Sequence, residues 1–285
     1  MTEGAASAFA TKVMSAAHQY GPLCAGIDPS AELLHGWNLD DAPGGLRTFC
    51  AICLEGFAGA VGVIKPQVAF FERHGSAGLA ELERLIADAR AVGLVVIADA
   101  KRGDIDSTAA AYADAWLRDS SPLAADAVTV HPYLGLGALA PCVELAAETG
   151  RGVIVVTRSS NPEGRSLQEA ATASGVSVED ALLAEIAAWN AAPGIPTGTL
   201  GVVIGATLAP SSFALSQLGG VILAPGLGAQ GAGPEEVAAL FAGCAPGMVL
   251  ASSSRGLLGQ GPDPGALRQA AVLLQSELSV LMGPE

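Results

Sequence analysis

The sequence predicts a closed barrel of eight parallel strands and surrounding helices, a (β/α)8 or TIM barrel, with one extra helix at its N-terminus. Eight short apolar stretches recur along the 285 residues, and each is followed by a helical pattern. Strands that alternate with helices pair in parallel, because a helical crossover returns the chain to the same end of the sheet. Barrels of this kind reach about 250 residues as one unit, so we expect a single domain over residues 1–285.

The expected elements follow in order along the chain. The segment from about Thr2 to Gln19 is the extra helix, which could cover the bottom of the barrel. Amphipathic stretches such as SAGLAELERLIADARAVG, with apolar residues three or four apart, form the helices between strands. An open, doubly wound sheet is an alternative, because periodicity does not reveal closure. The eight predicted strands cover residues 22–28, 61–67, 94–101, 127–133, 153–159, 200–207, 220–226 and 248–254.

Composition disfavours several classes of protein. Hydrophobic residues make up 51% of the chain and mean hydropathy is +0.45, yet no apolar run approaches the roughly 18 residues of a membrane helix. The N-terminus lacks the basic start and apolar block of a secretory signal, so we expect a cytoplasmic protein. The net charge of -14 disfavours nucleic acid and anionic membranes as partners.

The five cysteines do not suggest a disulfide framework, since their number is odd and they are scattered. CAIC at residues 50–53 has the spacing of a redox motif, but it falls within a helical pattern. We therefore expect Cys50 and Cys53 to be small core residues.

Charged residues gather at three strand ends. Ligands of parallel α/β proteins bind at the C-terminal ends of the strands, in a barrel and in an open sheet alike. Asp28 ends the first strand, Lys65 lies in the second, and Asp99, Lys101 and Asp104 lie at the third. Side chains alternate along a strand, so Asp99 and Lys101 point the same way. One such pair would fit a structural salt bridge, whereas five charges from three strand ends favour a preorganised charged site.

The later strand ends suggest a phosphate site. GLGAQG at residues 226–231 matches GxGxxG, but a dinucleotide fold needs that motif in its first unit. Barrels commonly bind phosphate after strands seven and eight, where glycine amides and Arg255 are available. His131 could be a general base or a packing residue. Ser160 and Asn161 could bind a polar ring or form a turn, at the start of a long connection that could move over the site.

These motifs resemble those of orotidine 5'-phosphate decarboxylases. DAKRGDI at residues 99–105 resembles the family signature, and GIDPS, VIKPQ, TVHPYLG, SSNP and PGLGAQG resemble its other strand ends in the same order. The resemblance covers nearly the whole chain and is greatest to the longer bacterial branch found in mycobacteria. Asp-x-Lys-x-x-Asp alone marks a wider group that includes sugar-phosphate decarboxylases and synthases, whereas KRGDI with the lysine of the second strand is more specific.

The resemblance implies a reaction and roles for individual residues. Members of this family convert orotidine 5'-phosphate to uridine 5'-phosphate and carbon dioxide, the last step of de novo pyrimidine synthesis, with no metal or organic cofactor. By resemblance, Lys101 donates the proton to C6, Asp99 lies beside the substrate carboxylate, and Lys65 and Asp28 hold the ribose and the charge network. Asp104 would act in the neighbouring subunit of a homodimer. Further substrate contacts are implied for Thr108 near Asp104, Ser160 at the pyrimidine, and Gln230 and Arg255 at the phosphate.

Two other functions stay open from the residues alone. A metal-dependent sugar-phosphate decarboxylase or aldolase on the same barrel would lose its activity with EDTA. A catalytically silent protein that binds phosphorylated ligands would bind uridine 5'-phosphate without turnover.

Overall fold

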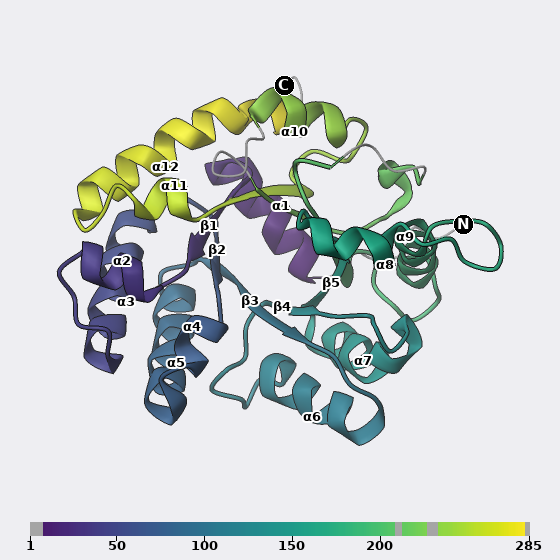
Figure 1. The fold of residues 1–285 in the computed structure, drawn as a ribbon, viewed down its shortest axis with the longest axis horizontal. Coiled ribbons are helices and arrows are strands. Elements are labelled where there is room, and N and C mark those ends of the chain that lie inside the picture. Colours follow the sequence, from purple (N-terminus) through teal and green to yellow (C-terminus); the bar gives the residue numbers. More distant parts are fainter. Residues whose placement is uncertain (1–7, 209–212, 227–232, 283–285) are drawn as a thin grey trace.

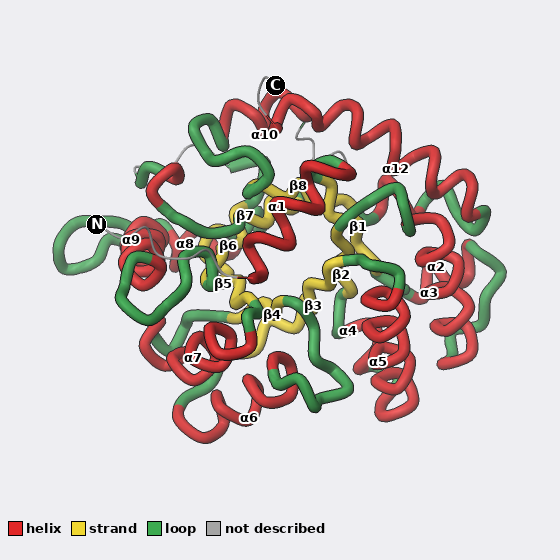
Figure 2. The backbone as a smooth tube through the Cα atoms, turned by 180° about the vertical axis from the view of Figure 1, so that it is seen from behind, coloured by secondary structure: helices red, strands yellow, loops and turns green. Residues whose placement is uncertain are grey.

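The computed structural model describes residues 8–208, 213–226 and 233–282. Eight parallel strands close into one barrel in sequence order, and β8 pairs with β1. Figure 2 shows the strands as a ring surrounded by helices. Closure excludes the open, doubly wound sheet and confirms the predicted barrel. The strands are β1 Leu23–Ile27, β2 Val63–Pro66, β3 Val95–Arg102, β4 Ala127–Val130, β5 Gly152–Arg158, β6 Leu200–Ile204, β7 Ile222–Pro225 and β8 Val249–Ser253.

Helices pack around the outside of the barrel, as Figure 1 shows. Between β6 and β7 the described residues form the 3-10 helix η3 (Leu215–Gln217) and no α-helix, so one expected crossover helix is replaced there. The α-helices are α1 Ala8–Tyr20, α2 Ala31–Gly36, α3 Pro43–Phe57, α4 Ala69–Glu72, α5 Gly75–Ala91, α6 Asp106–Leu117, α7 Ala140–Thr149, α8 Arg165–Gln168, α9 Val178–Asn190, α10 Pro234–Leu240, α11 Arg255–Leu258 and α12 Pro264–Leu278. The other 3-10 helices are η1 Leu136–Leu139, η2 Pro162–Gly164 and η4 Ser279–Met282.

The alternation of side chains along the strands creates two apolar cores. In β3, Val95 and Ile97 face the interior of the barrel, where they pack with residues of the other strands. Val96 and Ala98 of the same strand face outward and pack in the layer between the barrel and its helices. Asp99 follows Ile97 in the inward-facing series, so the alternation directs a carboxylate into the barrel mouth.

Helix α1 closes the N-terminal end of the barrel. Phe9 and Val13 are fully buried in the interior core. Phe9 packs so closely on Gly152, the first residue of β5, that a Cβ at that glycine would lie 2.3 Å from the ring. Lys12 Nζ lies 2.8 Å from Asp126 Oδ1, just before β4. The covering helix is thus confirmed for residues 8–20, residues 1–7 lie outside the described part, and ligands must enter from the opposite end.

The cysteines contribute to packing and form no disulfide bonds. All five are free thiols. Cys50 and Cys53 lie in α3 and are buried, and burial raises the pKa of both thiols, as expected for core residues. Within residues 8–208, 213–226 and 233–282, none of the helices is both long and apolar enough to span a bilayer.

Candidate active site

The end of β3 has an irregular backbone that brings its charged residues together. The register with β4 shifts between Ala98 and Arg102, and Lys101 has a φ of 48°, in the left-handed region that a lysine rarely adopts. With this bulge, Lys101 Nζ lies 2.5 Å from Asp99 Oδ1. The two side chains therefore meet on one side of the strand, as the alternation predicts.

Asp99 is the centre of a charge network from three strands. Its Oδ2 lies 3.0 Å from Lys65 Nζ of β2, while its Oδ1 contacts Lys101. Lys65 Nζ also lies 4.0 Å from Asp28 Oδ1, just beyond β1. Positive and negative groups thus alternate in the order Asp28, Lys65, Asp99 and Lys101. Four of the five charged residues singled out in the sequence are brought together.

Burial and charge act against each other on Asp99 and Lys65, which are 8% and 6% exposed. Burial alone would raise the pKa of Asp99, but the ammonium groups of Lys65 and Lys101 outweigh it and hold that pKa well below its usual range. Burial alone would lower the pKa of Lys65, but Asp99 and Asp28 raise it above its ordinary value. Both groups therefore stay charged at neutral pH.

Thr129 of β4 is a member of the network that sequence reasoning missed. Its side chain is fully buried, and its hydroxyl donates to Asp99 Oδ1 at 2.8 Å. The hydroxyl oxygen of Thr129 also accepts a hydrogen bond from the backbone amide of Lys101 at 2.9 Å. Threonine is common in strands, so the sequence AVTV at residues 127–130 does not indicate a functional residue. Its position in the strand could have indicated that it faces the site, because Ala127 faces the interior of the barrel and Thr129, two residues later, shares that face.

A cavity of about 290 Å³ opens beside the network. Asp28 and Lys65 line one side of it, and Ser254 and Arg255, which follow β8, line the other. Asp28 Oδ1 and Ser254 Oγ are buried there without a hydrogen bond to any described residue. Such polar atoms are costly to bury unpaired, so they are available to a ligand that carries hydroxyl groups.

The other predicted site residues are more dispersed. Asp104 accepts a hydrogen bond from the backbone amide of Ile105, and Thr108 is exposed on α6. Among the described residues, neither of them forms a hydrogen bond or ion pair with the Asp99 network. Ser160 lies two residues beyond β5 and is half-buried. Arg255 begins α11 on the cavity wall, while Gln230 lies outside the described residues.

Arg102 and His131 flank the network without joining it. Arg102 pairs with Glu72, and its guanidinium lies 5.8 Å from the ring centroids of both Tyr112 and Trp116. This arrangement fastens the end of β3 to α4 and α6. Burial and the nearby Lys101 lower the pKa of His131, so its imidazole is neutral at pH 7.

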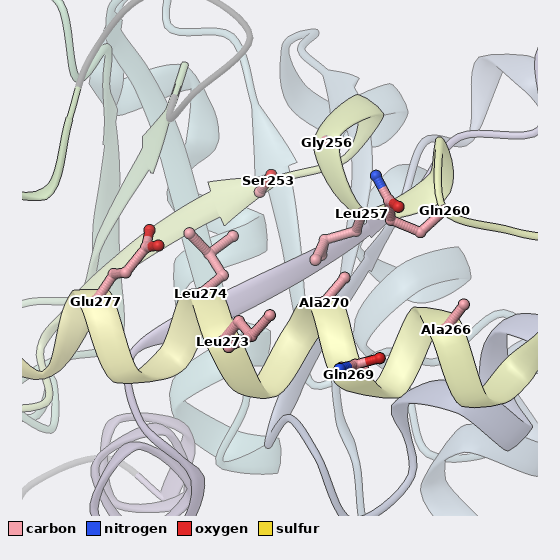
Figure 3. A pocket seen from close by; sticks show the side chains of 10 residues that line it. All are labelled: Ser253, Gly256, Leu257, Gln260, Ala266, Gln269, Ala270, Leu273, Leu274 and Glu277. Carbon is pink, nitrogen blue, oxygen red and sulfur yellow. The ribbon is translucent and has the colours of Figure 1, made fainter.

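A larger cavity of about 620 Å³ lies between α11 and α12, on the other side of β8 (Figure 3). Leucine, alanine and glutamine side chains dominate its wall, and Glu277 is the one charged residue among its described lining. Ser253, at the end of β8, contributes to both cavities. The convergent charges belong to the smaller cavity, which is therefore the candidate active site.

An eight-stranded barrel with an alternating lysine and aspartate network at its open end defines a barrel enzyme with a charged reaction centre. The model of the orotidine 5'-phosphate decarboxylase / HUMPS family matches residues 21–270, so the chain belongs to that family. Orotidine 5'-phosphate decarboxylases from Streptomyces coelicolor and Corynebacterium efficiens are each 49% identical to it, over 92% of this chain and 94% of theirs.

Solved structures agree with the family assignment. A Streptomyces avermitilis chain assigned as an orotidine 5'-phosphate decarboxylase has a TM-score of 0.92 and 47% identity, with 100% of this chain and 99% of that chain covered. The orotidine 5'-phosphate decarboxylase of Leishmania donovani has a TM-score of 0.74 and 28% identity, over 97% of this chain and 99% of that one. The similarity extends over the whole barrel rather than over one motif.

Proposed function

We propose that the chain decarboxylates orotidine 5'-phosphate to uridine 5'-phosphate and carbon dioxide, the last step of de novo pyrimidine synthesis. The observation that carries this proposal is the alternating network of Asp28, Lys65, Asp99 and Lys101 beside a cavity that Arg255 also lines. It occurs in a chain whose curated relatives, at 48–49% identity, bear the name of this activity.

The reaction requires charge to be stabilised at C6 of the pyrimidine. Loss of carbon dioxide leaves a carbanion that the ring delocalises poorly. Asp99 is held ionised, and a substrate carboxylate about 4 Å from it would be repelled by roughly 4 kcal/mol at an effective dielectric near 20. That repulsion is relieved as the carboxylate leaves, which corresponds to about a thousandfold in rate. The remaining acceleration must come from other groups.

Lys101 is suited to be the proton donor. Its side chain is 39% exposed, whereas that of Lys65 is 8% exposed, so Lys101 can reach a ligand in the barrel mouth. Asp99 holds its ammonium group next to the place where negative charge develops, which is electrostatic stabilisation by a preorganised group. Lys65 and Asp28 then bind the ribose hydroxyls, in keeping with the buried Oδ1 of Asp28, which has no hydrogen bond to a described residue.

The rest of the substrate supplies binding energy away from the reacting carbon. We assign the phosphate to Arg255 and Gln230, and the pyrimidine to Ser160. Arg255 lines the cavity, and a guanidinium binds phosphate oxygens with charge-assisted hydrogen bonds. Binding energy from such remote groups can be used to position the ring for reaction.

The proposal includes a homodimer in which Asp104 and Thr108 complete the neighbouring site. Ile105, Tyr133 and Leu134 lie close in sequence to Asp104 or to the end of β4, and their exposed fractions are 50%, 79% and 54%. Large exposed apolar side chains next to a functional loop are typical of an interface. Mixed dimers of the Lys101→Ala and Asp104→Ala variants should regain activity, because one of their two sites carries both native residues. Verified mixed dimers that stay inactive would argue against a shared site.

We further propose that residues 1–285 act as one domain in the cytoplasm without a metal or organic cofactor. Five free thiols are in keeping with a reducing compartment. The carboxylates of Asp28 and Asp99 face ammonium groups, which gives them a role that needs no metal.

The activity is tested by following the absorbance of orotidine 5'-phosphate on addition of purified protein, with and without EDTA. We expect turnover that EDTA does not change. Activity that EDTA abolishes and magnesium restores would favour the metal-dependent sugar-phosphate class. Binding of uridine 5'-phosphate without any absorbance change would favour the non-catalytic binding protein.

A further inference from the structure

The segment that follows β5 is fastened at its start by a buried ion pair. Arg158 is the last residue of β5, and its Nε lies 2.9 Å from Glu179 Oε2 in the first turn of α9. The two side chains are only 6% and 11% exposed. An ion pair so well shielded from water keeps its geometry, because separating the charges would leave each of them uncompensated. The end of β5 is therefore tied to the helix on the far side of the connecting segment.

Gln168 forms a second attachment, directly next to Ser160. Its Oε1 accepts from the backbone amide of Ser159 at 3.0 Å, and its Nε2 donates to Ser159 Oγ at 2.8 Å. Gly164 allows this approach, since a Cβ there would lie 2.8 Å from Ser159 Oγ. The short helix α8 thus holds the residue before Ser160 through both its backbone and its side chain.

The end of β6 forms a third attachment, behind Ser160. The amide of Gly205 donates to the carbonyl of Arg158 at 2.9 Å. A Cβ at Gly205 would lie 3.0 Å from Ser160 Cβ and 3.1 Å from its backbone nitrogen, which is closer than ordinary packing. Ser160 therefore lies between the Gln168 attachment on one side and Gly205, directly after β6, on the other.

We infer that Gln168 is a positioning residue for recognition of the pyrimidine, acting through Ser159 to hold Ser160 at the base. This inference rests on the proposed function, in which Ser160 contacts the base. Ser160 follows β5, whereas Arg255 follows β8, on a different part of the ring. The base and the phosphate are consequently held by separate segments, so the contribution of Gln168 can be measured apart from phosphate binding.

The test compares two ligands that differ only in the base, uridine 5'-phosphate and ribose 5-phosphate, by calorimetric titration. Gln168→Leu removes both hydrogen bonds to Ser159 at nearly constant volume. We expect its dissociation constant for uridine 5'-phosphate to rise about tenfold, the effect of about one hydrogen bond, with that for ribose 5-phosphate unchanged within about twofold. Gln168→Glu should restore most of the affinity. The new carboxylate can accept a hydrogen bond from the Ser159 hydroxyl and still accept one from the Ser159 backbone amide.

Gly205→Ala is a second, independent variant that should give the same loss for the nucleotide alone, since its methyl group displaces Ser160. Gln269→Leu, on the exposed surface of α12, is the matched control and should bind both ligands as the wild type does. Equal weakening of both ligands in Gln168→Leu, or none, would overturn the inference. Failure of the proposed function is distinct, because the wild type itself would then not turn over orotidine 5'-phosphate.

Discussion

Thr129→Val tests whether the hydroxyl beneath the charge network orders it. The substitution keeps the shape of a fully buried side chain and removes two hydrogen bonds, one donated to Asp99 Oδ1 and one accepted from the amide of Lys101. Asp99 then loses a donor that helps to hold its Oδ1. Lys101, whose backbone is in the left-handed conformation, loses the acceptor for its amide.

The expected magnitude follows from these two bonds. A hydrogen bond to an ionised group contributes about 1.5–3 kcal/mol, and leaving the part-buried amide of Lys101 without its acceptor costs about 1 kcal/mol, the low end of the range for a buried group. We therefore expect the free energy of unfolding to fall by roughly 3 kcal/mol or more, which lowers Tm by roughly 6–12 °C in a protein of this size. Misplacement of Asp99 and Lys101 should reduce kcat by about tenfold to hundredfold.

The assays are chemical denaturation, calorimetry and steady-state decarboxylation. Thr199→Val is the matched control, because Thr199 is also fully buried, but its hydroxyl donates to the carbonyl of Pro196 before β6, at the opposite end of the barrel. The control should lose about 1 kcal/mol of stability and keep its kcat. A Thr129→Val protein with reduced stability and native kcat would refute the positioning argument, and unchanged stability would refute the energetic one.

Three further predictions concern the charged residues. Lys101→Ala should abolish turnover while uridine 5'-phosphate still binds, and equal loss of both would make Lys101 structural. Arg255→Ala should raise KM by about tenfold to hundredfold, the effect of a charge-assisted bond, and unchanged kinetics would remove Arg255 from the site. Because Lys65 and Lys101 depress the folded-state pKa of Asp99, its stabilising effect is present above its unfolded pKa of about 3.9 and is lost as pH falls through the folded value. In denaturation curves, the stability gap between wild type and Asp99→Asn should be constant from about pH 8 to 5 and shrink progressively below about pH 4, whereas a gap that is undiminished at about pH 2 would contradict this assignment.

The order of strands was predictable because each is a short apolar stretch that ends in polar residues. All eight observed strands overlap the predicted ranges, although β3 ends one residue later, at Arg102, and β5 begins one residue earlier, at Gly152. Closure was not predictable from periodicity, since the pairing of β8 with β1 joins residues far apart in the sequence. The absence of an α-helix in the described residues between β6 and β7 also escaped prediction, because a polar and apolar alternation does not reveal how a short crossover packs.

The charged part of the site was predictable for a different reason. Lys65, Asp99 and Lys101 stand out because charge is rare at the ends of buried strands. Thr129 did not, because its role depends on contacts with β3 rather than on its own type. The long connection after β5, expected from the sequence to be a segment that could move over the site, contains η2 and α8 and an isolated bridge between Ala171 and Ser177, none of which the sequence pattern indicated. Side chains such as Gln168 add hydrogen bonds to those of its backbone, and such side chains carry no sequence signature of their own.

The unequal exposure of the two lysines bears on how the enzyme resets after each reaction. Asp28, Lys65, Asp99 and Lys101 carry two negative and two positive charges, so their formal charges cancel in the resting state. In the proposed reaction, carbon dioxide leaves as a neutral molecule, and the proton that replaces it at C6 comes from Lys101. The four groups then carry one proton fewer than in the resting state. Water must return that proton before the next cycle. Lys101, with 39% of its side chain in contact with solvent, can be recharged directly, whereas the enclosed Lys65 can hold its charge but not exchange it readily.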